Sequence, residues 1–138
     1  MKKYFINLLF LSILLTLLSC ETSGQIKLKK VDKFNTGIAY GLRIKDDLAY
    51  TTTNKSLIIL DAQNPEKLKK VSELEIGSPI FSLVLEGNYA YLAASDKGLI
   101  IVDISDSKNP QVVGQYTGDG DVGEIEIMNN YLLLFLKV

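Results

Sequence analysis

An internal repeat constrains this chain more than any other feature of its sequence. The stretch YTTTNKSLIILDAQNP at residues 50–65 is answered by YLAASDKGLIIVDISDSKNP at residues 91–110. A third copy then begins, and four of its positions match the second copy at a spacing of 42 residues: Leu83, Leu85, Asn88 and Tyr89 correspond to Ile125, Ile127, Asn130 and Tyr131. A fixed period of this length indicates that each copy is one structural unit that buries its apolar faces against its neighbours.

Each unit has the pattern of four short strands. Segments rich in Leu, Ile, Val, Tyr and Thr alternate with turn residues, and in the second unit they predict strands near 80–86, 89–94, 98–104 and 111–117. The third of these strands is apolar without alternation, which is typical of a strand covered on both faces. Four strands joined by tight turns make an antiparallel meander, and a repeat of about 40–50 residues with this content predicts an all-β fold of β-propeller-type blades.

The connections between the predicted strands carry typical turn residues. Asp46-Asp47, Gly87-Asn88 and Asn129-Asn130 each predict a two-residue hairpin of type I′, because these residues tolerate positive φ at both central positions. The second connection is one residue shorter in the first unit than in the second. The third connection contains Asn-Pro in both units, and aligning Asn64-Pro65 with Asn109-Pro110 predicts a three-residue insertion in the second copy.

The second unit resembles a known family along its length. Residues 87–116, GNYAYLAASDKGLIIVDISDSKNPQVVGQY, are similar to the LVIVD repeat of bacterial surface and exported proteins, with its Gly-Asn-Tyr-Ala-Tyr start, its Gly-Leu-x-Ile-Val-Asp strand and its Asn-Pro dipeptide. The first unit departs from that pattern at Asp46-Asp47-Leu48 and at Ser56, where the family has glycine. The resemblance implies a β-propeller fold, and it brings no catalytic residues that match positions in this chain.

The first twenty residues have the pattern of an export signal. Lys2 and Lys3 precede an apolar stretch, so residues 1–19 are interpreted as a signal peptide. The sequence Leu17-Leu18-Ser19-Cys20 resembles the lipobox of bacterial lipoproteins, which implies cleavage before Cys20 and lipidation of its thiol, whereas the alternative is an ordinary buried thiol. By the same resemblance, Glu21 permits the outer membrane, so the chain is predicted to be lipid-anchored in the bacterial cell envelope.

The rest of the chain divides into repeat units. Residues 20–25 are a lipidated N-terminus and linker, and residues 26–138 are predicted to be a partial propeller: an outer strand at 26–35, blades at 38–76 and 80–118, and a partial blade at 124–138. About two and three-quarter blades form an incomplete ring, because propellers close with about four to eight. We expect the chain to be a fragment of a longer propeller; the alternative is that several copies associate to complete a ring.

The composition excludes several kinds of chemistry. The chain has no histidine, which removes Ser-His-Asp and Cys-His mechanisms and imidazole metal sites. A net charge of −1 gives no electrostatic basis for nucleic-acid binding. No phosphate-binding loop is present, so we expect no catalytic residues, no cofactor and no enzymatic activity.

The remaining candidate site residues are carboxylates and tyrosines. Asp119, Asp121 and Glu124 form a weak calcium candidate in GDGDVGE, although the spacing is not that of an EF-hand and a solvated loop is the expected alternative. Asp61 and Asp103 could suggest an acid–base pair, but a carboxylate at a strand end more often accepts backbone amides of the next turn.

Two further patterns recur by position. Four repeated tyrosines are predicted to pack between blades rather than to stack on sugars: Tyr50, Tyr89, Tyr91 and Tyr131. The sequence KLKKV at 27–31 and 67–71 places lysines on predicted outermost strands, where charge deters edge pairing, with contact to anionic lipid as the alternative.

These observations favour a non-catalytic binding or scaffold module. Its partners would be the membrane, through lipidated Cys20, and an unknown protein or glycan. The alternative is a truncated propeller enzyme, hydrolase or quinoprotein-like, whose active site lies in blades outside this sequence; a non-functional remnant is a third possibility.

Overall fold

The structure, a computed structural model, describes residues 38–137. Within this range the chain forms ten β-strands and no helix. The predicted signal at 1–19, the segment 20–25 with Cys20 and Glu21, and the outer strand predicted at 26–35 lie outside the described residues. The described part of the chain contains no helix long and apolar enough to cross a membrane.

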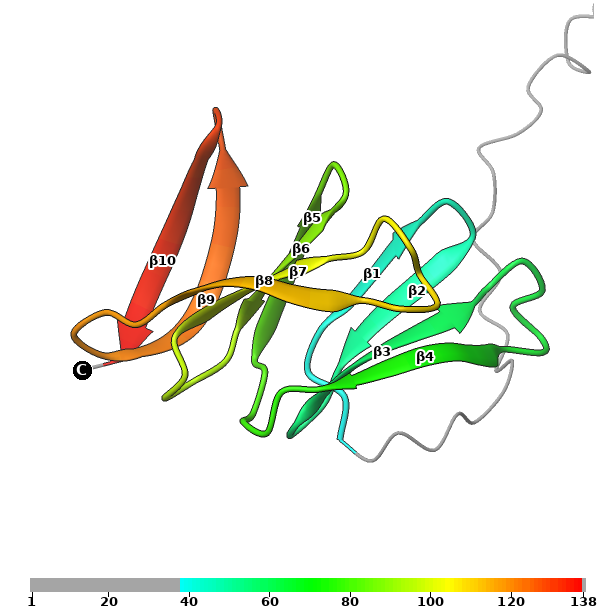
Figure 1. Cartoon of the computed structure of the whole chain (residues 1–138), viewed down its shortest axis with the longest axis horizontal. Coiled ribbons are helices and arrows are strands. Elements are labelled where there is room, and N and C mark those ends of the chain that lie inside the picture. The colour runs from blue at the N-terminus through cyan, green and yellow to red at the C-terminus, as the bar shows by residue number, and fades with distance from the viewer. Residues whose placement is uncertain (1–37, 138) are drawn as a thin grey trace, which may run out of the picture. The chain divides into compact units, whose positions relative to one another are not determined.

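The first sheet is a four-stranded antiparallel meander (Figure 1). It consists of β1 (Leu42–Lys45), β2 (Leu48–Thr52), β3 (Ser56–Asp61) and β4 (Lys69–Glu75), and each strand pairs with the next along the chain. The innermost strand is therefore β1 and the outermost is β4, as in a blade.

The second sheet repeats this order. It consists of β5 (Ser82–Glu86), β6 (Tyr89–Ala93), β7 (Leu99–Asp103) and β8 (Gln111–Tyr116). These bounds agree with the predicted strands to within two residues.

A two-stranded sheet follows, formed by β9 (Asp121–Met128) and β10 (Tyr131–Lys137). The predicted fold class is thus confirmed: the described chain is all-β, built from antiparallel blade-like sheets in an open arrangement (Figure 1).

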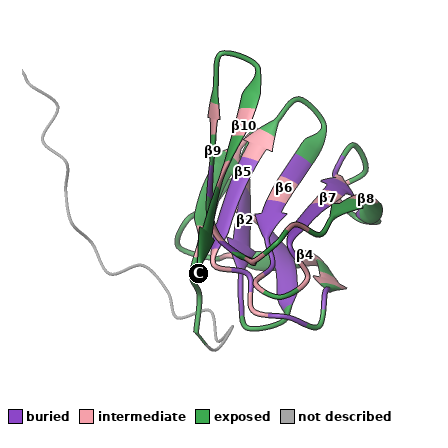
Figure 2. Ribbon diagram, turned by 90° about the vertical axis from the view of Figure 1, so that its left-hand side faces the viewer, coloured by how far each residue is buried: buried purple, intermediate pink, exposed green. Residues whose placement is uncertain are grey.

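The largest core lies between the first two sheets. Leu57 and Ile59 of β3 and Leu83 and Leu92 of the second sheet are fully buried in one cluster. Figure 2 shows most of β5, β6 and β7 coloured as buried. The next residue of β3, Ile58, points the other way and belongs to a separate cluster. Both faces of β3 are therefore apolar, which explains its lack of alternation. Burying each large aliphatic side chain contributes about 1.5–3 kcal/mol.

A second core joins the second sheet to the hairpin. Val84, Ala93 and Leu99 pack with Val122 and Ile125, which are both fully buried. The second sheet is thus covered on both faces, one by the first sheet and the other by β9 and β10.

The hairpin turns confirm two of the three predicted types. Both central residues have positive φ at Asp46-Asp47 (49° and 61°) and at Asn129-Asn130 (49° and 66°), as type I′ requires. The type I′ prediction is wrong at Gly87-Asn88. There only Gly87 has positive φ, 54°, because glycine at the first central position allows the type II′ pattern.

The structural interpretation of the two repeated aspartates is confirmed. The Asp61 carboxylate accepts a hydrogen bond from the Gln63 backbone N–H at 3.0 Å, and the Asp103 carboxylate accepts one from Ser105 N–H at 2.8 Å. Both residues therefore fix the start of the loop after the third strand.

The predicted insertion in the second copy is wrong. β4 and β8 begin 42 residues apart, and the loops before them have equal length. Asn64 accepts a bond from Glu66 N–H at 2.9 Å, and the residue that does the same in the second loop is Asp106, which accepts Lys108 N–H at 3.0 Å. Asn and Asp make this turn equally well, so Asn64 corresponds to Asp106 and not to Asn109. The two Asn-Pro dipeptides therefore lie three residues apart in loops of equal length.

Candidate functional site

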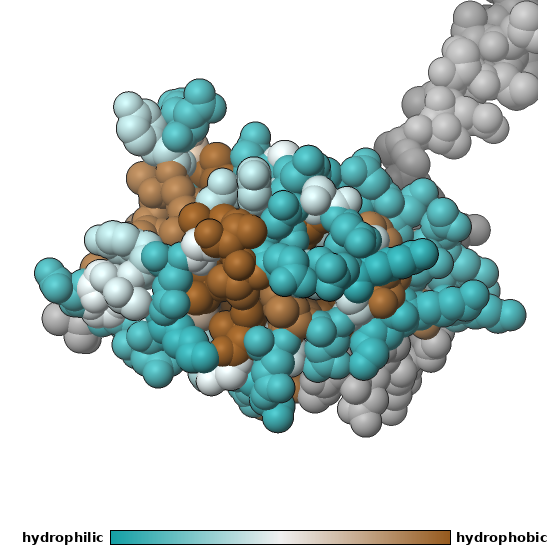
Figure 3. Space-filling view, in the orientation of Figure 1, coloured by the Kyte–Doolittle hydropathy of each residue, from teal (hydrophilic) through white to brown (hydrophobic). Residues whose placement is uncertain are grey.

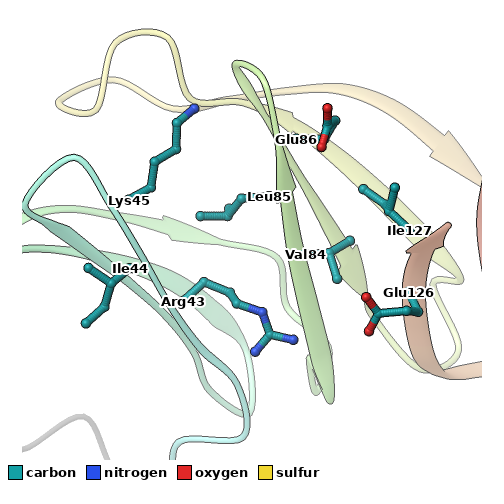
Figure 4. Close-up of a pocket in the computed structure, with 8 residues that line it drawn as sticks. All are labelled: Arg43, Ile44, Lys45, Val84, Leu85, Glu86, Glu126 and Ile127. Carbon is teal, nitrogen blue, oxygen red and sulfur yellow. The ribbon is translucent and has the colours of Figure 1, made fainter. Parts of the chain in front are cut away.

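The innermost strands of the three sheets border one opening, which we call the inner-strand pocket. β5 contacts β1 on one side and β9 on the other. The space between them is about 400 Å³ and is lined by eight residues of the three strands (Figure 4). Four are charged: Arg43 and Lys45 from β1, Glu86 from β5 and Glu126 from β9.

Strand register shows which pocket positions are equivalent. Arg43 pairs with Tyr50, Val84 with Tyr91 and Glu126 with Leu133, in each case two residues before the last position of the strand. The same position is therefore cationic, apolar or anionic in successive sheets.

The strand ends vary in the same way. Lys45, Glu86 and Met128 all immediately precede the hairpin turn. The residues between the two variable positions are Ile44, Leu85 and Ile127, and these stay apolar in all three sheets. Charge thus varies at the positions that flank this apolar residue in each inner strand.

Two hydrogen bonds orient the cationic side of the pocket. The Lys45 ammonium donates a hydrogen bond to the Gly87 carbonyl in the next sheet's hairpin turn. The Arg43 guanidinium donates to the Leu42 carbonyl at 3.0 Å, and Figure 4 shows its side chain extending from β1 toward β5. Cationic donors on one side and carboxylate acceptors on the other suit a ligand that carries both kinds of polar group.

Aromatic residues connect the beginnings of the inner strands. Tyr40 and Phe81, 41 residues apart, form an edge-to-face pair with ring centroids 5.3 Å apart. The Lys137 ammonium lies 4.0 Å from the centroid of Phe81, in cation–π geometry, and the Tyr40 hydroxyl donates to the Asn54 side-chain oxygen at 2.6 Å. The sequence analysis did not predict this cluster. The signal for it was that Tyr40 and Phe81 are about one repeat period apart.

Two of the three calcium-candidate carboxylates accept hydrogen bonds from serine hydroxyls. Glu124 accepts a bond from the Ser82 hydroxyl at 2.5 Å, and Asp121 accepts one from Ser95 at 3.3 Å, while Asp119 is exposed. Within residues 38–137, no three His, Cys, Asp or Glu side chains group together in a way that could hold a metal ion. Calcium binding stays a prediction, which isothermal titration can test. If no heat is measured at millimolar calcium, the prediction is refuted.

The four repeated tyrosines do not behave alike. Tyr50 is buried between the first two sheets and Tyr91 packs against the hairpin core, as predicted. The prediction is wrong for Tyr89 and Tyr131, which are 42% and 71% exposed. Both directly follow a turn, so they lie at the end of a sheet, where less of a neighbouring strand can cover them.

Burial also affects one titration. It raises the pKa of the Tyr50 phenol, and the negative charge of Asp46 raises this pKa further.

Two of the three lysines of the second KLKKV sequence lie on the outermost strand, as the pattern predicted, whereas Lys67 precedes that strand. Lys69 and Lys70 are exposed on β4, the outermost strand of the first sheet, and the first KLKKV at 27–31 lies outside the described residues. Lys70 forms an ion pair with Glu73 at 2.9 Å, and the bond from Lys70 lowers the pKa of the Glu73 carboxyl.

Comparison with known families identifies one unit of the chain. The LVIVD repeat family matches residues 81–118, a range that contains all four strands of the second sheet. No curated protein matches the chain. The chain therefore contains one matched LVIVD repeat, which coincides with its second sheet.

Proposed function

We propose that this chain is a non-catalytic binding module, lipid-anchored in the bacterial cell envelope, and that its inner-strand pocket contacts a protein or glycan partner. In this pocket the three sheets present different charges. Its cations come from β1 and its carboxylates from β5 and β9.

The observation that carries this proposal is the contrast between the two faces of the inner strands. Leu85 and Ile127 pack against the two buried cores, and the equivalent residue of the first sheet, Ile44, is apolar as well. Nothing in the packing of a blade requires Arg43 in one copy and Glu126 in another. In repeat folds, residues that differ between copies on an accessible surface supply specific contacts.

The anchor is proposed on the lipobox-like sequence before Cys20. Each buried methylene of an acyl chain contributes about 0.8 kcal/mol, so several chains hold a protein firmly on a membrane. Glu21 supports placement in the outer membrane.

Binding can be tested with charge-reversal variants of the full chain. Arg43→Glu and Glu126→Arg are compared with wild type against immobilised envelope glycans and envelope proteins. A contact at the centre of an interface contributes more than about 1 kcal/mol, so we expect at least about fivefold weaker binding.

The matched control is Lys70→Glu, which reverses a charge on outer strand β4, away from the pocket. Equal binding by the pocket variants and wild type would refute the role of the pocket.

The anchor has a separate test. Cells that express the full chain should incorporate labelled palmitate, and Cys20→Ala should abolish the label. Persistence of the label in Cys20→Ala would refute lipidation at this residue, whatever the outcome of the binding experiment.

A further inference from the structure

Each sheet has two faces, and the interfaces between sheets use them in one order. The forward face contains Tyr50 in the first sheet and Tyr91 in the second, and it packs on the sheet that follows in sequence. The backward face contains Leu83 in the second sheet and Ile125 in the hairpin, and it packs on the sheet that precedes. At both interfaces, therefore, the forward face of one sheet packs on the backward face of the next sheet.

The first sheet presents a backward face that is open at its inner strand. Leu42 and Ile44 occupy the positions of Leu83 and Leu85, as their distance from the hairpin turn shows. Leu83 is fully buried, whereas Leu42 is 57% exposed and Ile44 is 69% exposed. Both line a groove of about 310 Å³, whose other lining is mainly apolar and includes Ala49, Leu60 and Leu68.

The hairpin presents a forward face that is open as well. Leu133 pairs with Glu126 as Tyr91 pairs with Val84, so Leu133 stands at the position that packs in the second sheet. Phe135 on the same face is 58% exposed and Tyr131 is 71% exposed. The space-filling view shows apolar side chains gathered over the hairpin (Figure 3).

We propose that the forward face of the hairpin docks on the backward face of the first sheet in a second copy of this chain. The contact would continue the series that already joins the first sheet to the second and the second to the hairpin. Leu133 and Phe135 of one copy would enter the groove beside Leu42 and Ile44 of the other.

A two-stranded hairpin is sufficient for such a contact. The second sheet meets the hairpin through β5 and β6 against β9, and it meets the first sheet through β5 against β1 and β2. The interfaces are thus made largely by the two inner strands of each sheet. β9 and β10 supply both inner strands on one side, and β1 and β2 supply them on the other.

The surfaces in contact are different on the two copies, so the interface is heterologous. A heterologous contact leaves one open face on each end and therefore builds a closed ring or an open chain of copies, rather than a simple two-fold dimer. This property provides a test that does not depend on the size of the assembly.

The test is sedimentation velocity of the purified full chain in a mild detergent, over the micromolar to millimolar range. Wild type is expected to form oligomers. Phe135→Glu removes the forward face and Ile44→Glu removes the backward face, and each variant alone is expected to sediment as a single chain. Mixing the two variants should restore one intact contact and give a 1:1 dimer that grows no further.

The matched control is Val112→Glu, which places a charge at an exposed valine on outer strand β8, outside both faces. It should assemble as wild type does. Circular dichroism of each variant checks that the sheets remain folded. A single-chain wild type, oligomers that survive both variants, or a mixture that stays monomeric with folded variants would each overturn the proposal.

Discussion

The two four-stranded sheets share a backbone and differ in what they present to solvent. Both have the same strand order, and both have a register shift at the same place, between Ile59 and Leu60 in the first and between Ile101 and Val102 in the second. Their outer strands differ. β4 reads KKVSELE and carries four charges, whereas β8 reads QVVGQY and carries none.

The inner strands show the same division. Lys45 in the first sheet corresponds to Glu86 in the second, although the hairpins that follow them have equal length. Strand order, hairpin length, the bulge and most buried positions are therefore what the repeat preserves, because they determine the backbone and the packing. Solvent-facing positions are free to differ, and the specific properties of each copy lie there.

The largest test of this comparison exchanges equivalent leucines for alanine. Leu83→Ala removes a fully buried side chain from the core between the sheets and should lower the free energy of unfolding by about 2–5 kcal/mol. Leu42→Ala removes the equivalent, 57% exposed side chain and should change the single chain by no more than about 0.5 kcal/mol. Urea denaturation at a concentration that keeps the chain monomeric measures both; equal losses would contradict the assignment of the two faces.

A second test uses a glycine position at which the copies differ. Gly98 has φ of 77°, and a Cβ there would lie 2.2 Å from the Tyr116 carbonyl oxygen. Gly98→Ala should therefore destabilise the chain by about 1–3 kcal/mol. Ser56 stands at the corresponding place in the first sheet and already has a Cβ, so Ser56→Ala should cost less. If Gly98→Ala has the same urea midpoint as wild type, the close contact between Gly98 and the Tyr116 carbonyl of β8 is refuted.

A third test compares equivalent tyrosines at alkaline pH. The folded pKa of Tyr50 is raised above its unfolded value near 10, so the neutral phenol stabilises the fold below that value. Stability should fall as the pH rises from about 10 toward the folded pKa, because the unfolded chain then loses a proton that the folded chain retains. Tyr50→Phe should reduce this alkaline loss in denaturation curves, and Tyr91→Phe controls for removal of a hydroxyl. An unchanged slope in Tyr50→Phe would refute the effect.

The smallest expected effect concerns the outer strands. Val112 in β8 occupies the position of Lys70 in β4, as the register of each sheet shows. Val112→Lys should therefore leave the free energy of unfolding within about 0.5 kcal/mol of wild type. A loss above 1 kcal/mol in thermal or urea denaturation would show that Val112 is packed rather than exposed.

The sequence predicted the fold well because two physical constraints leave strong signals. An unalternating apolar strand such as β3 needs cover on both faces, and a turn such as Asn129-Asn130 needs residues that tolerate positive φ. The predictions were wrong where more than one residue type, or more than one turn type, can form the same connection. Asp106 replaces asparagine in a turn, and Gly87 allows a different hairpin type.

The candidate site was harder to predict, because it depends on contacts between strands that are distant in sequence. The inner-strand pocket joins residues of β1, β5 and β9, and no single stretch contains it. The usable signal was the alignment of Arg43, Val84 and Glu126, where charge changes from copy to copy. The exposure of Tyr89 and Tyr131 was hard to predict for a related reason: the sequence shows that both follow a turn, but not how far a neighbouring strand extends to cover them.

The central claim is that neighbouring repeat units within the chain fold as separate sheets that share one core. Native-state hydrogen exchange tests this claim directly. Leu83→Ala lies in the second sheet, but its side chain is buried against the first. We predict that the variant lowers the protection of the β3 amides together with that of the β6 amides. Reduced protection confined to β5–β8, with β3 unchanged from wild type, would contradict the account.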